Sequence, residues 1–185
     1  MNKYIRILLG LLILYFVGES IYSEIKKDKT PGKAKRLECQ KKVTSFERGL
    51  SDADILYAQN LIEHGNIDFT STVEKAIYSK SKLFEYISLA KMDDMFNNKL
   101  KSYVKYNEKN EEKYKLSYYV YENDKNDPGK KTSKSKLYAG YVVLEVKDSN
   151  NKSIYKVQID FMNDNGSDIK ETLDCTLESF MTYNK

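Results

Sequence analysis

The spacing of apolar residues changes along the chain from a helical period to a strand period. Between residues 51 and 103, apolar positions recur every three or four residues, which places them on one face of an α-helix. From Tyr114 onward, apolar and polar residues alternate, as they do along a strand with one buried face. The sequence therefore predicts helices first and a sheet afterwards.

The start of the helical half has one clear signal and one ambiguous one. Ser51 with Asp54 forms a capping pattern, and Gly65 supplies a stop, so a helix of about three turns is expected between them. Just before it, residues 39–50 fit one helical stripe, whereas Leu37–Val43 also fits an extended segment. Both interpretations of this segment stay open.

Further helix is expected up to residue 103. Ser71 with Glu74 repeats the start signal, and apolar residues continue at helical spacing as far as Ile87. Another apolar stripe runs from Met92 to Tyr103. The sequence thus predicts that the first half of the domain is helical.

Four strands are expected in the second half, joined by short or hairpin-compatible loops. The pair Asn165-Gly166, before the last strand, is typical of a hairpin turn. The expected strands are Tyr114–Tyr121, Leu137–Val146, Tyr155–Phe161 and Ile169–Met181.

These elements predict an α+β domain with helices packed across one face of a curved four-stranded antiparallel meander. The order of elements is similar to that of cystatin-like and nuclear-transport-factor-like rolls. This is an analogy of architecture, because no residue motif in the chain carries it.

The amino terminus has the pattern of a topogenic segment. Lys3 and Arg6 precede an unbroken apolar run over residues 7–18, the length of a signal-peptide core and shorter than a comfortable membrane span. Small residues permit cleavage before Ile21, and the alternative is an uncleaved anchor over residues 4–22. We expect export, although the lysines after the run would favour a cytoplasmic domain under the positive-inside rule.

Charge divides the chain into parts. The first 48 residues hold 11 Lys and Arg against 5 Asp and Glu, while the remainder holds 20 against 22. A slightly acidic domain does not favour polyanions, so no nucleic-acid partner is expected. The chain is interpreted as a signal peptide or anchor over 1–22, a basic linker over 23–49 and an α+β domain over 50–185.

Known catalytic patterns are missing from the sequence. His64 is the only histidine, it falls at the end of the first clear helix, and no HExxH or glycine-rich phosphate loop is present. We therefore expect no catalytic residues, no metal site and no cofactor, and the sequence favours a protein that is not an enzyme.

Two residue sets stand out instead. Cys39 and Cys175 are the only cysteines, and an oxidising compartment favours joining them in a disulfide. Of the 16 tyrosines, Tyr119, Tyr121 and Tyr141 fall at alternating strand positions and form the candidate interaction face.

The expectation for function is an exported or membrane-anchored bacterial envelope protein, periplasmic or otherwise extracytoplasmic, that acts as a protein-protein interaction or assembly factor. Its partner would be a protein of the cell envelope, with membrane contact through residues 4–22 if these are not cleaved. The alternatives are a periplasmic binding module for a small ligand or glycan, and an unrecognised hydrolase. A concave pocket would favour the binding module, and a filled core the interaction protein.

Overall fold

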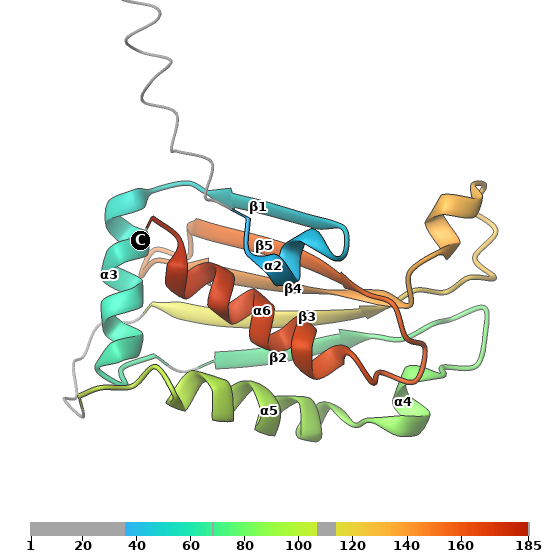
Figure 1. The fold of residues 1–185 in the computed structure, drawn as a ribbon, viewed down its shortest axis with the longest axis horizontal. Coiled ribbons are helices and arrows are strands. Elements are labelled where there is room, and N and C mark those ends of the chain that lie inside the picture. The colour runs from blue at the N-terminus through green and yellow to red at the C-terminus, as the bar shows by residue number, and fades with distance from the viewer. Residues whose placement is uncertain (1–35, 68, 107–113, 185) are drawn as a thin grey trace, which may run out of the picture. The chain divides into compact units, whose positions relative to one another are not determined.

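Five strands form a single mixed sheet. The structure, a computed structural model, describes residues 36–67, 69–106 and 114–184. The strand order is β1-β5-β4-β3-β2; β1 pairs antiparallel with β5, the neighbours β3, β4 and β5 are antiparallel, and β2 runs parallel to β3 (Figure 1). The strands are β1 (Ser45–Gly49), β2 (Phe69–Glu74), β3 (Lys115–Glu122), β4 (Gly140–Lys147) and β5 (Ser153–Phe161).

The long helices cover one face of this sheet. Helix α6 lies across β4 and β5, and α5 packs beside α6 and β2, while α3 contacts β5 near one end of the sheet (Figure 1). The helices are α2 (Glu38–Lys41), α3 (Asp52–Glu63), α4 (Leu83–Tyr86), α5 (Leu89–Lys101) and α6 (Ile169–Thr182), with a 3-10 turn, η1 (Ser133–Lys136). In the part of the chain that the structure describes, the opposite face of the sheet carries no helix.

Large aromatic side chains fill the space between the helices and the sheet. Each is almost fully buried, and each contributes a large apolar surface to the core. Ring pairs connect the helices with the sheet. The ring centroids of Phe96 on α5 and Tyr118 on β3 are 4.9 Å apart, and those of Tyr155 on β5 and Phe180 on α6 are 5.0 Å apart. These residues are Phe96, Tyr118, Tyr155, Phe161 and Phe180.

Several predicted elements are confirmed. Helix α3 begins after Ser51 and ends at His64, where the capping pattern and the glycine stop placed it. Helix α5 corresponds to the predicted stripe over 92–103, and β3, β4 and β5 to the first three predicted strands. Strand β3 alternates between buried and half-buried residues, which is the pattern that predicted it.

The predicted helix start at Ser71 and Glu74 is wrong, because this segment is strand β2. Its sequence, FTSTVE, is rich in the β-branched residues that suit a pleated surface, and it pairs with β3 along its whole length. Residues 39–50 likewise do not form one helix, since the short α2 is followed by β1. A local capping pattern and a single stripe were outweighed by pairing with the sheet.

The predicted fourth strand over residues 169–181 is also wrong, because it is helix α6. Ile169, Leu173 and Leu177 are four residues apart, a spacing that satisfies both a strand period of two and a helical turn. Thr172 and Thr176, between them, are buried while Glu171 is exposed, a pattern that fits the helix and not a strand with its odd-numbered positions inward. The sheet is therefore mixed and five-stranded, and the expected antiparallel meander is limited to β3, β4 and β5.

The turn at Asn165-Gly166 joins a strand to a helix and not two strands. Gly166 has φ +68°, and a Cβ there would lie 2.6 Å from Leu83 Cδ1, so glycine suits both the backbone and the space. The Asp168 carboxylate accepts the Met162 N–H at 2.6 Å and closes the turn.

One face of helix α6 holds the first residues of the folded chain in place. Glu171, Cys175 and Ser179 are spaced by four, so they lie on this same face of the helix. Glu171 pairs with Lys42 at 2.9 Å, Cys175 forms the expected disulfide with Cys39, and Ser179 accepts a hydrogen bond from Gln40 at 3.0 Å.

No helix within the described ranges is long and apolar enough to cross a membrane. The expected signal peptide or anchor over residues 1–22 and the first part of the basic linker, residues 23–35, lie outside the described residues. The rest of that linker, residues 36–49, includes α2 and β1.

We expect the disulfide to contribute substantially to stability. It closes a loop across a sequence separation of 136 residues, and chain entropy then gives a stabilisation of about 5 kcal/mol. Replacing both residues, Cys39→Ser with Cys175→Ser, should lower the free energy of unfolding in urea by several kcal/mol. The reduced wild-type protein is the matched control and should behave like the double variant; a loss below about 1 kcal/mol in both would contradict the chain-entropy account.

Candidate functional site

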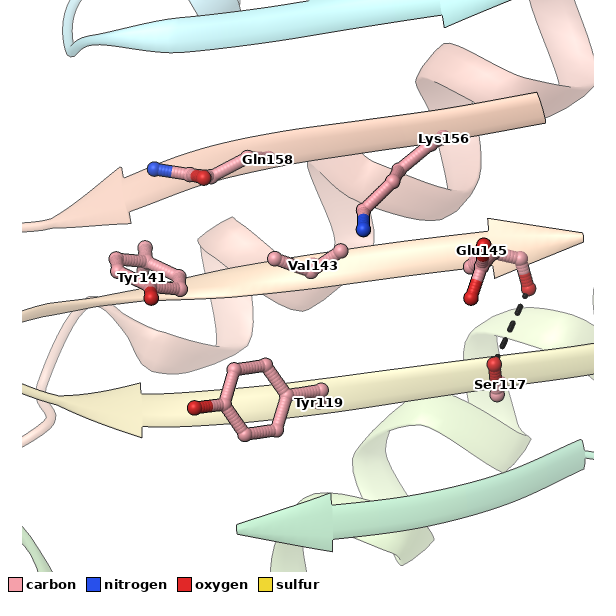
Figure 2. Close-up of a pocket in the computed structure, with 7 residues that line it drawn as sticks. All are labelled: Ser117, Tyr119, Tyr141, Val143, Glu145, Lys156 and Gln158. Atoms are coloured by element: carbon pink, nitrogen blue, oxygen red, sulfur yellow. Dashed lines mark hydrogen bonds between the residues drawn. The ribbon is translucent and has the colours of Figure 1, made fainter. Parts of the chain in front are cut away.

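The uncovered face of the sheet has a mixed aromatic, aliphatic and polar surface. Alternation along β3, β4 and β5 turns every second side chain away from the helices, so a continuous set of half-buried or exposed residues faces outward (Figure 2). This surface, called the tyrosine face below, comprises Ser117, Tyr119, Tyr121, Tyr141, Val143, Glu145, Lys156 and Gln158.

The three tyrosines singled out in the sequence lie together on this face. Tyr121 and Tyr141 are directly opposite each other on neighbouring strands and stack with 4.7 Å between ring centroids. Tyr119 packs against Tyr141 on the other side at 6.2 Å, and Tyr138 adds a fourth ring 6.4 Å from Tyr141. The sheet register therefore builds one aromatic cluster from residues 20 positions apart.

Polar contacts hold two of these rings in place. The Tyr119 hydroxyl donates to the Glu74 carboxylate on β2. Burial, this hydrogen bond and the negative charge of Glu74 all raise the pKa of Tyr119, so its hydroxyl remains a donor. The Lys130 ammonium lies 5.2 Å from the centre of the Tyr121 ring and donates to its hydroxyl at 2.9 Å.

A shallow hollow of about 350 Å³ lies on the tyrosine face. Tyr119 and Val143 form its apolar floor, and in Figure 2 the Tyr119 ring presents its flat side to the open surface. The Ser117 hydroxyl donates to the Glu145 backbone carbonyl at 3.4 Å, and the Glu145 carboxylate pairs with Lys147 at 3.3 Å. A serine bonded to a carbonyl is not coupled to a base, so this arrangement suits recognition better than nucleophilic catalysis.

A second feature, which the sequence analysis missed, is a pair of buried carboxylates at the end of β3. Glu122 accepts the backbone N–H groups of Lys82 at 2.7 Å and Leu83 at 2.9 Å. Asp124 accepts the Ile77 N–H at 2.7 Å, the Tyr78 N–H and the Ser79 hydroxyl. The sequence signal is the acidic pair two residues apart, Glu122 and Asp124, at the end of an apolar strand.

The hydrogen bonds to Asp124 strongly favour its charged form. Burial alone would raise its pKa, but the Ser79 hydroxyl and the backbone N–H groups of Tyr78, Asn126 and Ile77 together lower the pKa to about 2. The carboxylate is thus a negatively charged anchor for the loop between β2 and α4.

The other candidate residues have structural positions. Both cysteine sulfurs are joined in the disulfide, so neither is a free thiol. His64 ends helix α3 as expected, with its Nδ1 2.9 Å from the Asn60 carbonyl oxygen and its ring stacked on Tyr106. Among the described residues, no cluster of three or more His, Cys, Asp or Glu side chains is placed to hold a metal ion.

Comparison of the chain with protein-family models, with curated protein sequences and with solved structures found no match. The analogy with cystatin-like and nuclear-transport-factor-like rolls accordingly stays an expectation.

Asp124 should stabilise the fold in a pH-dependent way. Its folded pKa of about 2 lies below the ordinary 3.8, so its contribution is complete above about pH 4 and is lost as the pH falls towards 2. Asp124→Asn should lower the unfolding free energy by about 2 kcal/mol at pH 7, and the difference from wild type should shrink at pH 2. Urea unfolding at several pH values measures both.

Asp94 provides the matched control, because it is exposed on α5. Asp94→Asn should change the unfolding free energy by less than about 0.5 kcal/mol. If the difference in unfolding free energy between wild type and Asp124→Asn were the same at pH 7 and pH 2, the charged form of Asp124 would not be what anchors the loop.

Proposed function

We propose that this protein is a non-enzymatic interaction or assembly factor of the bacterial cell envelope, and that it binds a protein partner through the tyrosine face. The observation that carries the proposal is the uncovered sheet face with its cluster of stacked, half-buried tyrosines. Tyrosine is enriched at protein interfaces because its ring gives apolar contact area and its hydroxyl gives a hydrogen bond.

The rigidity of the cluster supports this use. Tyr119 is held by Glu74, and Tyr121 by Lys130 and by the ring of Tyr141. Side chains that are already fixed lose little conformational entropy when a partner binds, so more of the contact energy is available for affinity. The side chains between the helices and the sheet form one cluster of buried apolar residues, which favours an interaction surface over an internal ligand cavity.

The free edge of strand β1 is less suited to a partner than the face. The Ser45 carbonyl accepts a hydrogen bond from Arg36 Nη2 at 3.4 Å. At the other end of the strand the backbone of Gly49 hydrogen-bonds the Tyr183 hydroxyl, which lies 2.3 Å from where a Cβ would be. These contacts occupy groups that an added strand would need.

The proposed location rests on two features. The Cys39–Cys175 disulfide is compatible with an extracytoplasmic compartment, where disulfides persist. The apolar run over residues 7–18 has the length of an export signal core.

A glycan-binding role is the second candidate. The hollow on the tyrosine face combines the exposed flat side of a tyrosine ring with several polar groups, a combination that suits a sugar stacked on the ring. It differs from the first candidate in its ligand and not in its surface.

Site-specific photocrosslinking in the native host tests the proposed partner. A benzophenone amino acid placed at Tyr119, Tyr141 or Val143 should give the same crosslinked product, because all three contact one partner. The matched control is Leu56, which is exposed on α3, where the crosslinker should not give this product. Adding Val143→Glu should remove the product formed from position 119, whereas Leu56→Glu should leave it unchanged.

Products of equal yield from Leu56, or no product from any position on the tyrosine face, would count against a protein partner. In the second case, chemical-shift changes at Tyr119 on titration with envelope oligosaccharides would support the glycan-binding role instead.

A further inference from the structure

Two loops meet at one end of the sheet. Strands β2, β3 and β5 point in the same direction, so the loop that follows β2 and the loop that follows β3 leave from the same end (Figure 1). The segments 75–82 and 123–139 are called the lysine tip below. In Figure 1 the second of these carries the turn η1 and projects beyond the sheet.

The lysine tip carries a concentration of positive charge, whereas the domain as a whole has no net positive charge. It contains eight lysines and two aspartates, although residues 49–185 together are slightly acidic. Lys80, Lys82 and Lys125 pair with Glu85 and Asp164, which neutralises part of this positive charge. One of the two aspartates, Asp124, is buried beneath the loop. Lys131, Lys134 and Lys136 are all exposed, and they lie within six residues of one another.

Exposed apolar side chains accompany the lysines. Ile77 is 80% exposed, Tyr78 62% and Leu137 67%. Largely exposed isoleucine and leucine side chains beside lysines are unfavourable in water, but this combination is typical of segments that enter the boundary between lipid headgroups and acyl chains.

The loops are held rigidly in this arrangement. Asp124 fixes the backbone of Ile77 and Tyr78, so both side chains are directed outward by a buried anchor. On the second loop, the Asn123 side chain donates to the carbonyls of Ser135 at 3.0 Å and Tyr138 at 2.8 Å. These contacts bring Leu137 and the lysines before it to the same end as Ile77.

We propose that the lysine tip docks on an anionic lipid surface, with Ile77, Tyr78 and Leu137 inserted at the headgroup level and the lysines facing the lipid phosphates. Charge complementarity identifies the occupant, because lysines attract an anionic leaflet while the apolar side chains gain from leaving water. The tip adjoins the tyrosine face through Lys130 and Tyr138, but the side chains proposed to enter the lipid are different ones, so this contact does not depend on the partner proposed there.

The experiment uses the full chain with its native disulfide and a reporter of depth. An environment-sensitive nitrobenzoxadiazole dye is attached to Ile77→Cys or Leu137→Cys, and in a control protein to Leu56→Cys on α3. Each protein is combined with vesicles of phosphatidylcholine alone or mixed with phosphatidylglycerol. The tip labels should shift to the blue and be quenched by brominated lipid only with phosphatidylglycerol, and the Leu56 label should not respond.

Because the label reports its own position, membrane attachment through the amino terminus alone would not produce this result. Each lysine near an anionic surface contributes about a factor of five in binding, so Lys131→Gln with Lys134→Gln and Lys136→Gln should raise the anionic lipid needed for a half-maximal shift roughly 100-fold. The matched control removes the same charge elsewhere, with Lys91→Gln, Lys101→Gln and Lys152→Gln, and should leave that amount of lipid nearly unchanged.

Three results would overturn the proposal. The first is the absence of a shift at Ile77 and Leu137 in anionic vesicles, and the second is an equal response from the Leu56 label. The third is a shift of the same size with soluble polyglutamate in place of vesicles, which would assign the tip to an acidic protein.

Discussion

The packing of aromatic side chains between the helices and the sheet is the constraint on which the rest of the molecule depends. Phe96 on α5 and Phe180 on α6 each meet a tyrosine of the sheet, and these contacts draw the long helices to the same side. Because the long helices all pack on one face of the sheet, no helix of the described residues covers the other face. The tyrosine face is a direct result of this arrangement.

At the end of the sheet, charged groups stabilise the structure in the way that apolar groups do in the core. The loop after β2 has few buried apolar side chains, and its backbone is held by Glu122 and Asp124 instead. A carboxylate that accepts several N–H groups can define a loop conformation with few residues. The outward side chains of that loop are not needed to hold its conformation, so they can contact another surface.

The sequence could predict elements where one periodicity was consistent and a second signal agreed with it. Helix α3 had a stripe, a start and a stop, and β3 alternated without exception, so both were found. The segment at Ser71 had a helical start signal but β-branched residues, and pairing with β3 decided its structure. Such pairing joins residues far apart in the chain, and local patterns do not record it.

The candidate site was predictable in part for the same reason. Alternation placed Tyr119, Tyr121 and Tyr141 on one face, and the register of β3 and β4 then made them neighbours. The anchor at Asp124 was not predictable, because the groups that it holds, two backbone N–H groups and the Ser79 hydroxyl, are more than 40 residues away in the chain. Helix α6 was mistaken for a strand since a spacing of four fits both periods, and the exposure of Glu171 together with the burial of Thr172 and Thr176 separates them.

The bond between Cys39 and helix α6 also determines how the domain would carry mechanical load. Tension applied through the residues that precede Cys39 would pass across the sulfurs into the middle of α6, at the centre of the core. Strand β1 lies within the covalent loop, so peeling it from β5 would not lengthen the path between a tether and the core. A domain pulled from its amino terminus would thus keep its sheet closed under forces that would otherwise unzip the edge strand.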